Sequence, residues 1–221
     1  MKLVRPTILV LLAALAFGGC TKNNPETPPE AAPPLFPLAF GNWWNYHIQA
    51  FSADSSVAYD AHDTLAVVDT STLKGKHVFI ALENNSKANT HIYYYSGDTL
   101  FDLQPVTNTT DTSIGIFIFN TANVANNLIL IDSIGMDSSV YYTAQRLDST
   151  NAIVNTGYAT LSCFKYRTVN YLYKTFDLDS TVEYDYYASG VGLVKQEAII
   201  PDGKGGHYRS FELVLENYVL H

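Results

Sequence analysis

Short runs in which apolar and polar residues alternate, separated by turn sequences about every ten residues, constrain this chain more than any other feature. Trp44, Tyr46 and Ile48 alternate with their neighbours, and Phe211–Leu215 repeats the same period of two. Glycine-containing sequences such as Asn155-Thr156-Gly157 separate the runs. This spacing predicts antiparallel hairpins.

The same pattern covers most of the chain after residue 34. Further strands are expected at Val57–Val68, His77–Leu82, His91–Tyr95, Thr99–Leu103, Ile114–Phe119, Val140–Gln145, Ala159–Tyr173, Val182–Tyr187 and Leu193–Ile200. Only Thr121–Ile131 has a composition that would permit a short helix. Strands and helices do not alternate as a parallel sheet requires, so we expect no cofactor at strand ends. We predict an all-β domain over residues 35–221, an antiparallel curved sheet of half-barrel or sandwich-like form.

The first twenty residues have the pattern of an export signal. Lys2 and Arg5 precede the ten apolar residues Ile8–Phe17, and two glycines follow before Cys20. A run of this length is too short to span a bilayer, which needs about 20 apolar residues. The segment resembles a bacterial lipoprotein signal, in which the cysteine is lipidated and becomes the mature N-terminus. We predict a cleaved signal peptide at residues 1–19; the alternative is an ordinary secretory signal with a chance cysteine.

A proline-rich segment follows the cysteine directly. Residues 21–34 contain five prolines and no aromatic residue, a composition typical of an extended tether of about 3.1 Å per residue. We therefore predict a lipid-anchored tether at residues 20–34, with palmitate or a similar acyl chain on Cys20. The predicted partner is the membrane, and the predicted location is the outer membrane of a Gram-negative bacterium.

The charge balance excludes one class of partner. Residues 1–19 hold two of the 13 basic residues and no acidic residue, so the mature chain keeps 11 basic and 21 acidic residues, a net charge of −10. Nucleic-acid-binding proteins normally carry the opposite sign. We expect no nucleic-acid partner.

Motifs of catalysis and metal binding are missing from the sequence. It has neither a Gly-x-Ser-x-Gly elbow nor a His-Glu-x-x-His helix, and no two of its six histidines lie within four residues of each other. Cys163 shares a strand face with Leu161, which indicates a buried, unreactive thiol. We predict no catalytic residue, no metal and no cofactor. A hydrolase whose site is assembled in space remains a lesser alternative.

Tyrosine is unusually common, and several tyrosines are adjacent. Neighbouring side chains on a strand point to opposite faces, so Tyr93-Tyr94-Tyr95 and Tyr186-Tyr187 must each supply both faces of a sheet. Exposed rings can stack on sugars or partner proteins, whereas buried ones stabilise the sheet as cross-strand pairs.

Two segments resemble the opening and closing sequences of a large group of bacterial lipoproteins that are themselves similar to the TapB-like proteins. The matching residues are Phe36-Pro37-Leu38, Gly41-Asn42, Trp44 and Tyr46 at the start, and Tyr187-Ala188, Gly190-Val191-Gly192-Leu193-Val194-Lys195 and Glu197 near the end. The resemblance implies an antiparallel, strongly curved sheet on a lipid anchor, and it supplies no catalytic residues.

The favoured function is a non-enzymatic envelope lipoprotein that binds an apolar or lipid-like ligand on a concave sheet. The residues expected to contact that ligand are Trp44, Tyr46, Tyr94 and Tyr186. The alternative is a surface module that binds glycans or proteins through exposed tyrosines.

Overall fold

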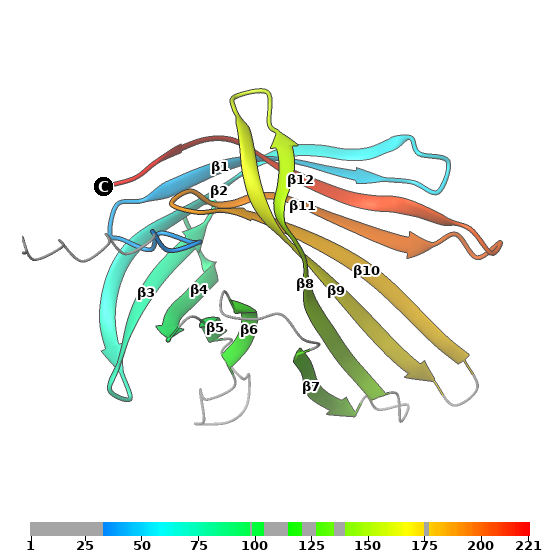
Figure 1. The fold of residues 1–221 in the computed structure, drawn as a ribbon, viewed down its shortest axis with the longest axis horizontal. Helices are drawn as coiled ribbons and strands as arrows, with labels where there is room; N and C mark the ends of the chain where they lie inside the picture. Colours follow the sequence, from blue (N-terminus) through cyan, green and yellow to red (C-terminus); the bar gives the residue numbers. More distant parts are fainter. Residues whose placement is uncertain (1–32, 98, 104–114, 121–126, 135–139, 175–176) are drawn as a thin grey trace, which may run out of the picture. The chain divides into compact units, whose positions relative to one another are not determined.

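The computed structural model describes residues 33–97, 99–103, 115–120, 127–134, 140–174 and 177–221, and within these the chain forms one curved antiparallel sheet (Figure 1). Its strands are β1 (Trp43–Phe51), β2 (Val57–Leu73), β3 (Lys76–Glu83), β4 (Ser86–Ser96), β5 (Thr99–Leu103), β6 (Gly115–Asn120), β7 (Asn127–Ile134), β8 (Val140–Asn155), β9 (Thr160–Lys174), β10 (Asp177–Ala188), β11 (Gly192–Pro201) and β12 (His207–Val219). The described part of the chain contains no helix, so the all-β prediction is confirmed.

The strand order shows how two meanders become one sheet. It runs β6-β5-β4-β3-β2-β1-β12-β11-β10-β9-β8-β7, so strands that are adjacent in the sheet are also consecutive in sequence, except at the centre. There β1 pairs with β12, with Trp43 opposite Val219 and Ala50 opposite Phe211. The end strands β6 and β7 do not pair with each other within the described residues, and the sheet stays open.

One segment forms a strand where its composition would also permit a short helix. Asn127–Ile131, the C-terminal part of the segment considered for a helix, belongs to β7 and pairs with β8, with Leu128 opposite Ala144. The neighbouring strand supplies the backbone hydrogen bonds that an asparagine-rich helix would have to provide alone. Residues 121–126 lie outside the described part. No helix long and apolar enough to cross a membrane occurs among the described residues.

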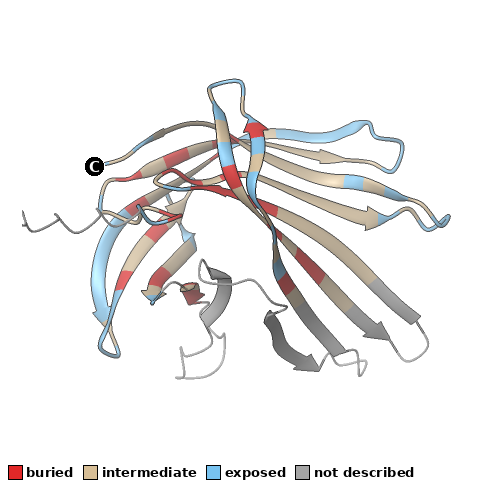
Figure 2. Cartoon of the chain, viewed as in Figure 1, coloured by how far each residue is buried: buried red, intermediate tan, exposed pale blue. Residues whose placement is uncertain are grey.

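Alternation along the strands separates an inner, concave face from an outer face. Trp44, Val67 and Leu215 are almost fully buried on the inner face. Figure 2 shows that buried residues follow the middle of the sheet, whereas the exposed residues concentrate toward hairpin ends. The core thus lies inside the curl, and side chains of every second residue fill it.

The segment before β1 packs against this inner face. Phe36 is 4% exposed and stacks on Trp44, with 4.7 Å between ring centroids. The edges of the Tyr93 and Tyr187 rings also contact it, at 5.8 and 6.5 Å. Because Tyr93 belongs to β4 and Tyr187 to β10, Phe36 joins the two meanders from inside.

The two segments that resemble the lipoprotein group contact each other close to Phe36. Trp44 donates its indole N–H to the carbonyl of Val191 at 2.6 Å, and Asn42 accepts a hydrogen bond from the backbone N–H of His221 at 2.8 Å. Gly41, which has a φ of 89°, lies in the turn directly before β1. The opening and closing sequences therefore form one structural unit around β1.

Tyr95 holds the Phe36 segment in place, which gives a direct test. Its hydroxyl donates to the Phe36 carbonyl at 2.8 Å and accepts from the Phe36 N–H at 3.2 Å. We expect Tyr95→Phe to lower the free energy of unfolding by about 1–3 kcal/mol, because two backbone groups lose their partner. Chemical denaturation of the intact chain measures this. Tyr94→Phe is the matched control and should change little; an equal effect of both variants would contradict the role of Tyr95.

Candidate functional site

The concave face contains a pocket of about 640 Å³. Its apolar lining comes from both meanders and from the segment before β1: Phe36, Tyr46, Leu65, Tyr93, Tyr187 and Leu213. These side chains line it because each occupies an inward position of its strand or, for Phe36, lies across the inner face. The pocket is thus a direct product of the curl and of the alternation.

One side of the pocket carries a row of polar groups on four neighbouring strands. Asp63 on β2, Glu83 on β3 and His91 on β4 line the pocket, and Asp102 on β5 lies behind His91. The Nδ1 atom of His91 is 2.8 Å from Oδ2 of Asp102, and its Nε2 atom is 3.7 Å from Oε2 of Glu83. Its ring stacks on Tyr93 with an interplanar angle of 2°. Two carboxylates therefore hold the imidazole.

Burial and mutual repulsion shift the titration of this row. The pKa of Asp63 is raised to about 6, mainly by burial and also by the hydrogen bond and the negative charge of Glu83. The pKa of His91 is raised above its usual value, mainly by its hydrogen bond to Asp102, against the opposing effect of burial. The site favours a neutral Asp63 and a protonated His91 at mildly acid pH.

A second polar group comes from β10 and β11. The Gln196 side-chain amide donates to Oε1 of Glu183 and, at 2.8 Å, to Oδ1 of Asp185. The pKa of Asp185 is raised to about 7, mainly by burial and also by the negative charge of Glu183, while the Gln196 hydrogen bond acts in the opposite direction. Burial also raises the pKa of Glu183. Two carboxylates thus share one amide in a desolvated position.

The structure places the four residues predicted to bind a ligand at different sites. Tyr46 lines the pocket and donates its hydroxyl to the Leu193 carbonyl at 3.3 Å. Trp44 is fully buried in the core beside Phe36. Tyr94 and Tyr186 are buried on the outer face, because their neighbours Tyr93 and Tyr187 take the inward positions.

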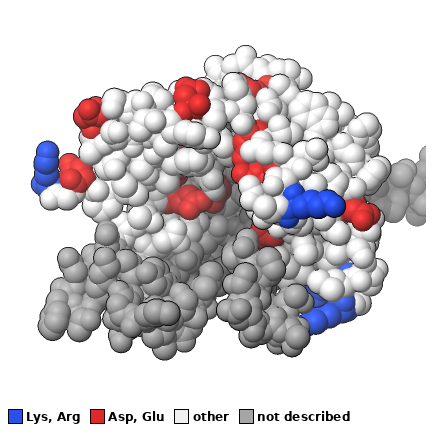
Figure 3. Space-filling model, turned by 180° about the vertical axis from the view of Figure 1, so that it is seen from behind, with Lys and Arg blue, Asp and Glu red and all other residues white. Residues whose placement is uncertain are grey.

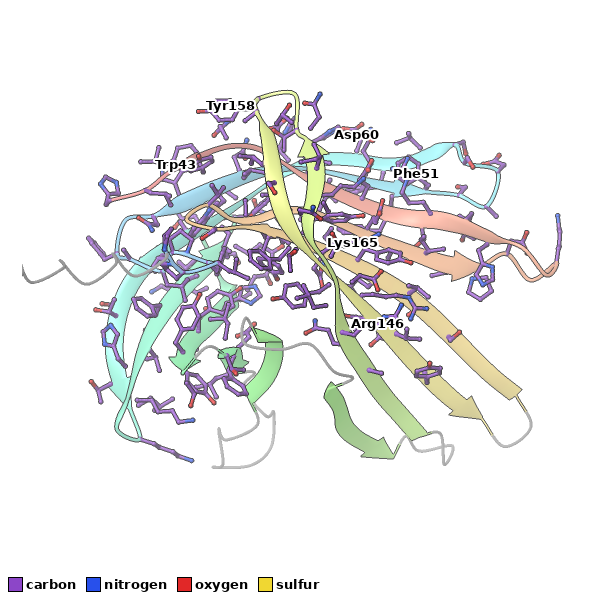
Figure 4. The ribbon with its side chains drawn as sticks, viewed as in Figure 1. Trp43, Phe51, Asp60, Arg146, Tyr158 and Lys165 are labelled. Atoms are coloured by element: carbon purple, nitrogen blue, oxygen red, sulfur yellow. The ribbon has the colours of Figure 1, made fainter. Side chains whose placement is uncertain are left out.

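Contacts on the outer face explain why these two tyrosines are covered. Tyr94 stacks on Phe101 with 4.9 Å between centroids, and the Lys76 ammonium lies 3.9 Å from its ring centre. Tyr186 donates its hydroxyl to Glu197 at 2.8 Å, with Lys165 5.4 Å from its ring centre. Figure 4 labels Lys165 among the other side chains of the sheet. Both rings are therefore parts of the sheet's own packing.

Other predicted site features are as follows. Cys163 is fully buried, as expected, and burial raises the pKa of its thiol to about 11. Cys20 lies outside the described residues. In the part of the chain that the structure describes, no group of three or more histidine, cysteine or acidic side chains is arranged to hold a metal ion.

Sequence reasoning missed the acidic residues of the pocket. The sequence does contain a signal for them. The inward positions of β2 read Asp63, Leu65, Val67, and those of β10 read Glu183, Asp185, Tyr187. Carboxylates on the apolar face of a strand are unusual. Assigning these carboxylates to the inward face required the pairing register of the strands, which the structure supplies.

No protein-family model and no curated protein matches the chain. Among solved structures, a candidate exported protein with a YmcC-like fold from Bacteroides fragilis aligns with a TM-score of 0.48 at 12% identity, over 86% of this chain and 100% of that one. A candidate lipoprotein from Parabacteroides distasonis aligns with a TM-score of 0.48 at 13% identity, over 85% and 99%. At these values the likeness assigns neither family nor function, and the resemblance to TapB-like proteins stays a prediction.

Proposed function

We propose that this chain is a lipid-anchored lipoprotein of the bacterial envelope that binds a largely apolar small molecule on the concave face of its sheet. The pocket of about 640 Å³ is the observation that carries the proposal. Its volume lies in the range of small-molecule sites, about 300–1,000 Å³, and aromatic and aliphatic side chains dominate its lining. Anchoring through Cys20, in the outer membrane, is supported by the signal and tether sequences.

The proposed function is ligand binding, with no catalytic step. His91 lies near Asp102 in a pocket, as a hydrolase would require, but both ring nitrogens face carboxylates. No serine or cysteine is among the described residues that line the pocket, and the hydroxyl of Thr168, which does line it, accepts a hydrogen bond from the side-chain amide of Gln145 at 3.1 Å. Among the described residues His91 has no hydrogen bond to a serine, threonine or cysteine, as a histidine that activates a nucleophile would have.

Binding of glycans through paired tyrosines has less support. Tyr93, Tyr94, Tyr186 and Tyr187 are all at most 9% exposed, so their rings offer no flat outer surface. The mostly exposed tyrosines among the described residues are Tyr158, 63% exposed and labelled at the tip of the β8–β9 hairpin in Figure 4, and Tyr59 on β2, 58% exposed. Neither belongs to a group of adjacent tyrosines.

Filling the pocket should abolish binding. We expect Leu213→Trp to weaken the binding of 4-phenylbutanol, an uncharged aromatic probe, at least about tenfold, because the larger ring occupies the apolar space. Ligand-observed NMR titration of the intact chain measures the affinity. The matched control is Val214→Trp, the next residue on β12, which faces outward and pairs with His47 and Lys195.

Two results would overturn the proposal. One is that 4-phenylbutanol does not bind and native mass spectrometry of the purified chain finds no co-purified lipid. The other is that both tryptophan variants weaken binding equally. Mass spectrometry that finds Cys20 unacylated in its native envelope would overturn the anchoring part.

A further inference from the structure

The lining of the pocket is strongly acidic for an apolar cavity. Four carboxyl side chains line it, Asp63, Glu83, Glu183 and Asp185, against one histidine. No lysine or arginine is among the described residues of the lining. Seen from behind, acidic side chains gather around the central hollow of that face (Figure 3).

Most of these charges have partners within the sheet. Glu83 lies 3.7 Å from Nε2 of His91, and Gln196 donates to both Glu183 and Asp185. Asp63 differs, because its Oδ1 atom is buried and has no hydrogen-bond partner among the described residues. The whole residue is only 9% exposed.

An unpaired buried acceptor is costly, and native proteins rarely keep one without a reason. Here Glu83, another carboxyl, increases the cost of ionising Asp63, and the positive charge of His91 opposes it only in part. A donor that enters the pocket would satisfy Oδ1 of Asp63. A positively charged donor would also relieve the repulsion between Asp63 and Glu83.

We propose that the pocket selects an organic cation, a protonated amine on an apolar body, and that its ammonium group binds against Asp63 and Glu83. This inference rests on the proposed function, because it names the ligand class of the same pocket. Tyr46 and Tyr93 also line the pocket. Aromatic rings attract a cation as well as an alkyl or aryl group. A fatty acid is disfavoured, because its carboxylate would join four others.

Three probes that share one apolar body test the charge preference. They are 4-phenylbutylamine, 4-phenylbutanol and 4-phenylbutyrate, titrated into the intact chain at pH 8, where an alkylamine stays protonated and Asp63 is ionised. We expect the amine to bind about tenfold more tightly than the alcohol, and the carboxylate to bind more weakly than the alcohol. Added salt should reduce the preference for the amine.

The outcomes separate this inference from the proposed function. If the alcohol binds in the pocket and the amine binds no better, the apolar pocket stands and the cation site is wrong. If none of the three probes binds, both are wrong. Tighter binding of 4-phenylbutyrate than of the amine would overturn the cation site alone.

A matched pair of variants tests the position of the ammonium group. Asp63→Asn keeps the shape of the side chain and removes its charge, so the ratio of amine affinity to alcohol affinity should fall about tenfold. Retained binding of 4-phenylbutanol reports that the pocket is intact. Asp60→Asn is the control, since Asp60 lies three residues away on the same strand, on the outer face, bonded to His47 and Gln49. An equal loss in both variants, or no loss in Asp63→Asn, would overturn the assignment.

Discussion

Replacing Gly192 with alanine is expected to lower the free energy of unfolding by about 4 kcal/mol. A Cβ atom at this position would lie 2.4 Å from Cδ2 of Phe36 and 3.2 Å from Nε1 of Trp44. Phe36 has no room to retreat, because its ring stacks on Trp44 and contacts tyrosines of both meanders. Overpacking costs about 1–3 kcal/mol, and the φ of 108° adds a strain of about the same size for a residue other than glycine.

The effect of overpacking at Gly192 can be separated from that of backbone strain. Gly75 also has a positive φ, 78°, but no atom lies within 4 Å of the position of its Cβ. Gly75→Ala should therefore show only the conformational cost, about 1 kcal/mol. Urea denaturation of the intact chain measures both variants. Equal losses at the two positions would mean that Phe36 does not pack against Gly192 as described.

Local features of the sequence predicted the hairpins well, because a hairpin depends on neighbouring residues. Thr99–Leu103 is a strand with the predicted ends, and the sequence Asn155-Thr156-Gly157 lies where β8 ends and the chain turns into β9, as predicted. Asn84 and Asn85, each with a positive φ, make a turn that was not singled out. Asn127–Ile131 forms a strand although its composition would permit a short helix, because its pairing with β8 is not apparent from its own composition.

The centre of the fold depends on contacts that span nearly the whole chain. Trp44 and Val191 are 147 positions apart, and Asn42 and His221 are 179 apart. The resemblance identified glycines and aromatic residues near both ends of the domain. It did not predict that these residues contact each other. The inward position of Tyr46 followed from alternation; the grouping of Asp63 with Glu83 required the pairing of β2 with β3.

The pH dependence of stability is the second large effect that we expect. The free energy of unfolding should fall by about 4 kcal/mol between pH 5 and pH 8. The pKa of Asp185 is about 7 and that of Asp63 about 6, against a usual 3.8, so the folded chain binds more protons than the unfolded chain in this range. Stability must then decrease as the pH rises. At about 1.4 kcal/mol per pH unit, Asp185 contributes about 3 kcal/mol and Asp63 about 1 kcal/mol.

His91 acts in the same direction, because a raised histidine pKa gives stability that is lost as the pH rises through it. Asp60 does not contribute, since hydrogen bonds from Gln49 and His47 lower its pKa and confine its effect to more acid conditions. Urea denaturation of the intact chain at pH 5 and pH 8, at equal ionic strength, measures the change. Asp185→Asn should remove most of it, because an amide cannot ionise beside Glu183, whereas Asp60→Asn should leave it intact. Greater stability at pH 8 than at pH 5 would show that these carboxyl groups are not held in a desolvated, mutually repelling arrangement, and the acidic pocket would lose its physical basis.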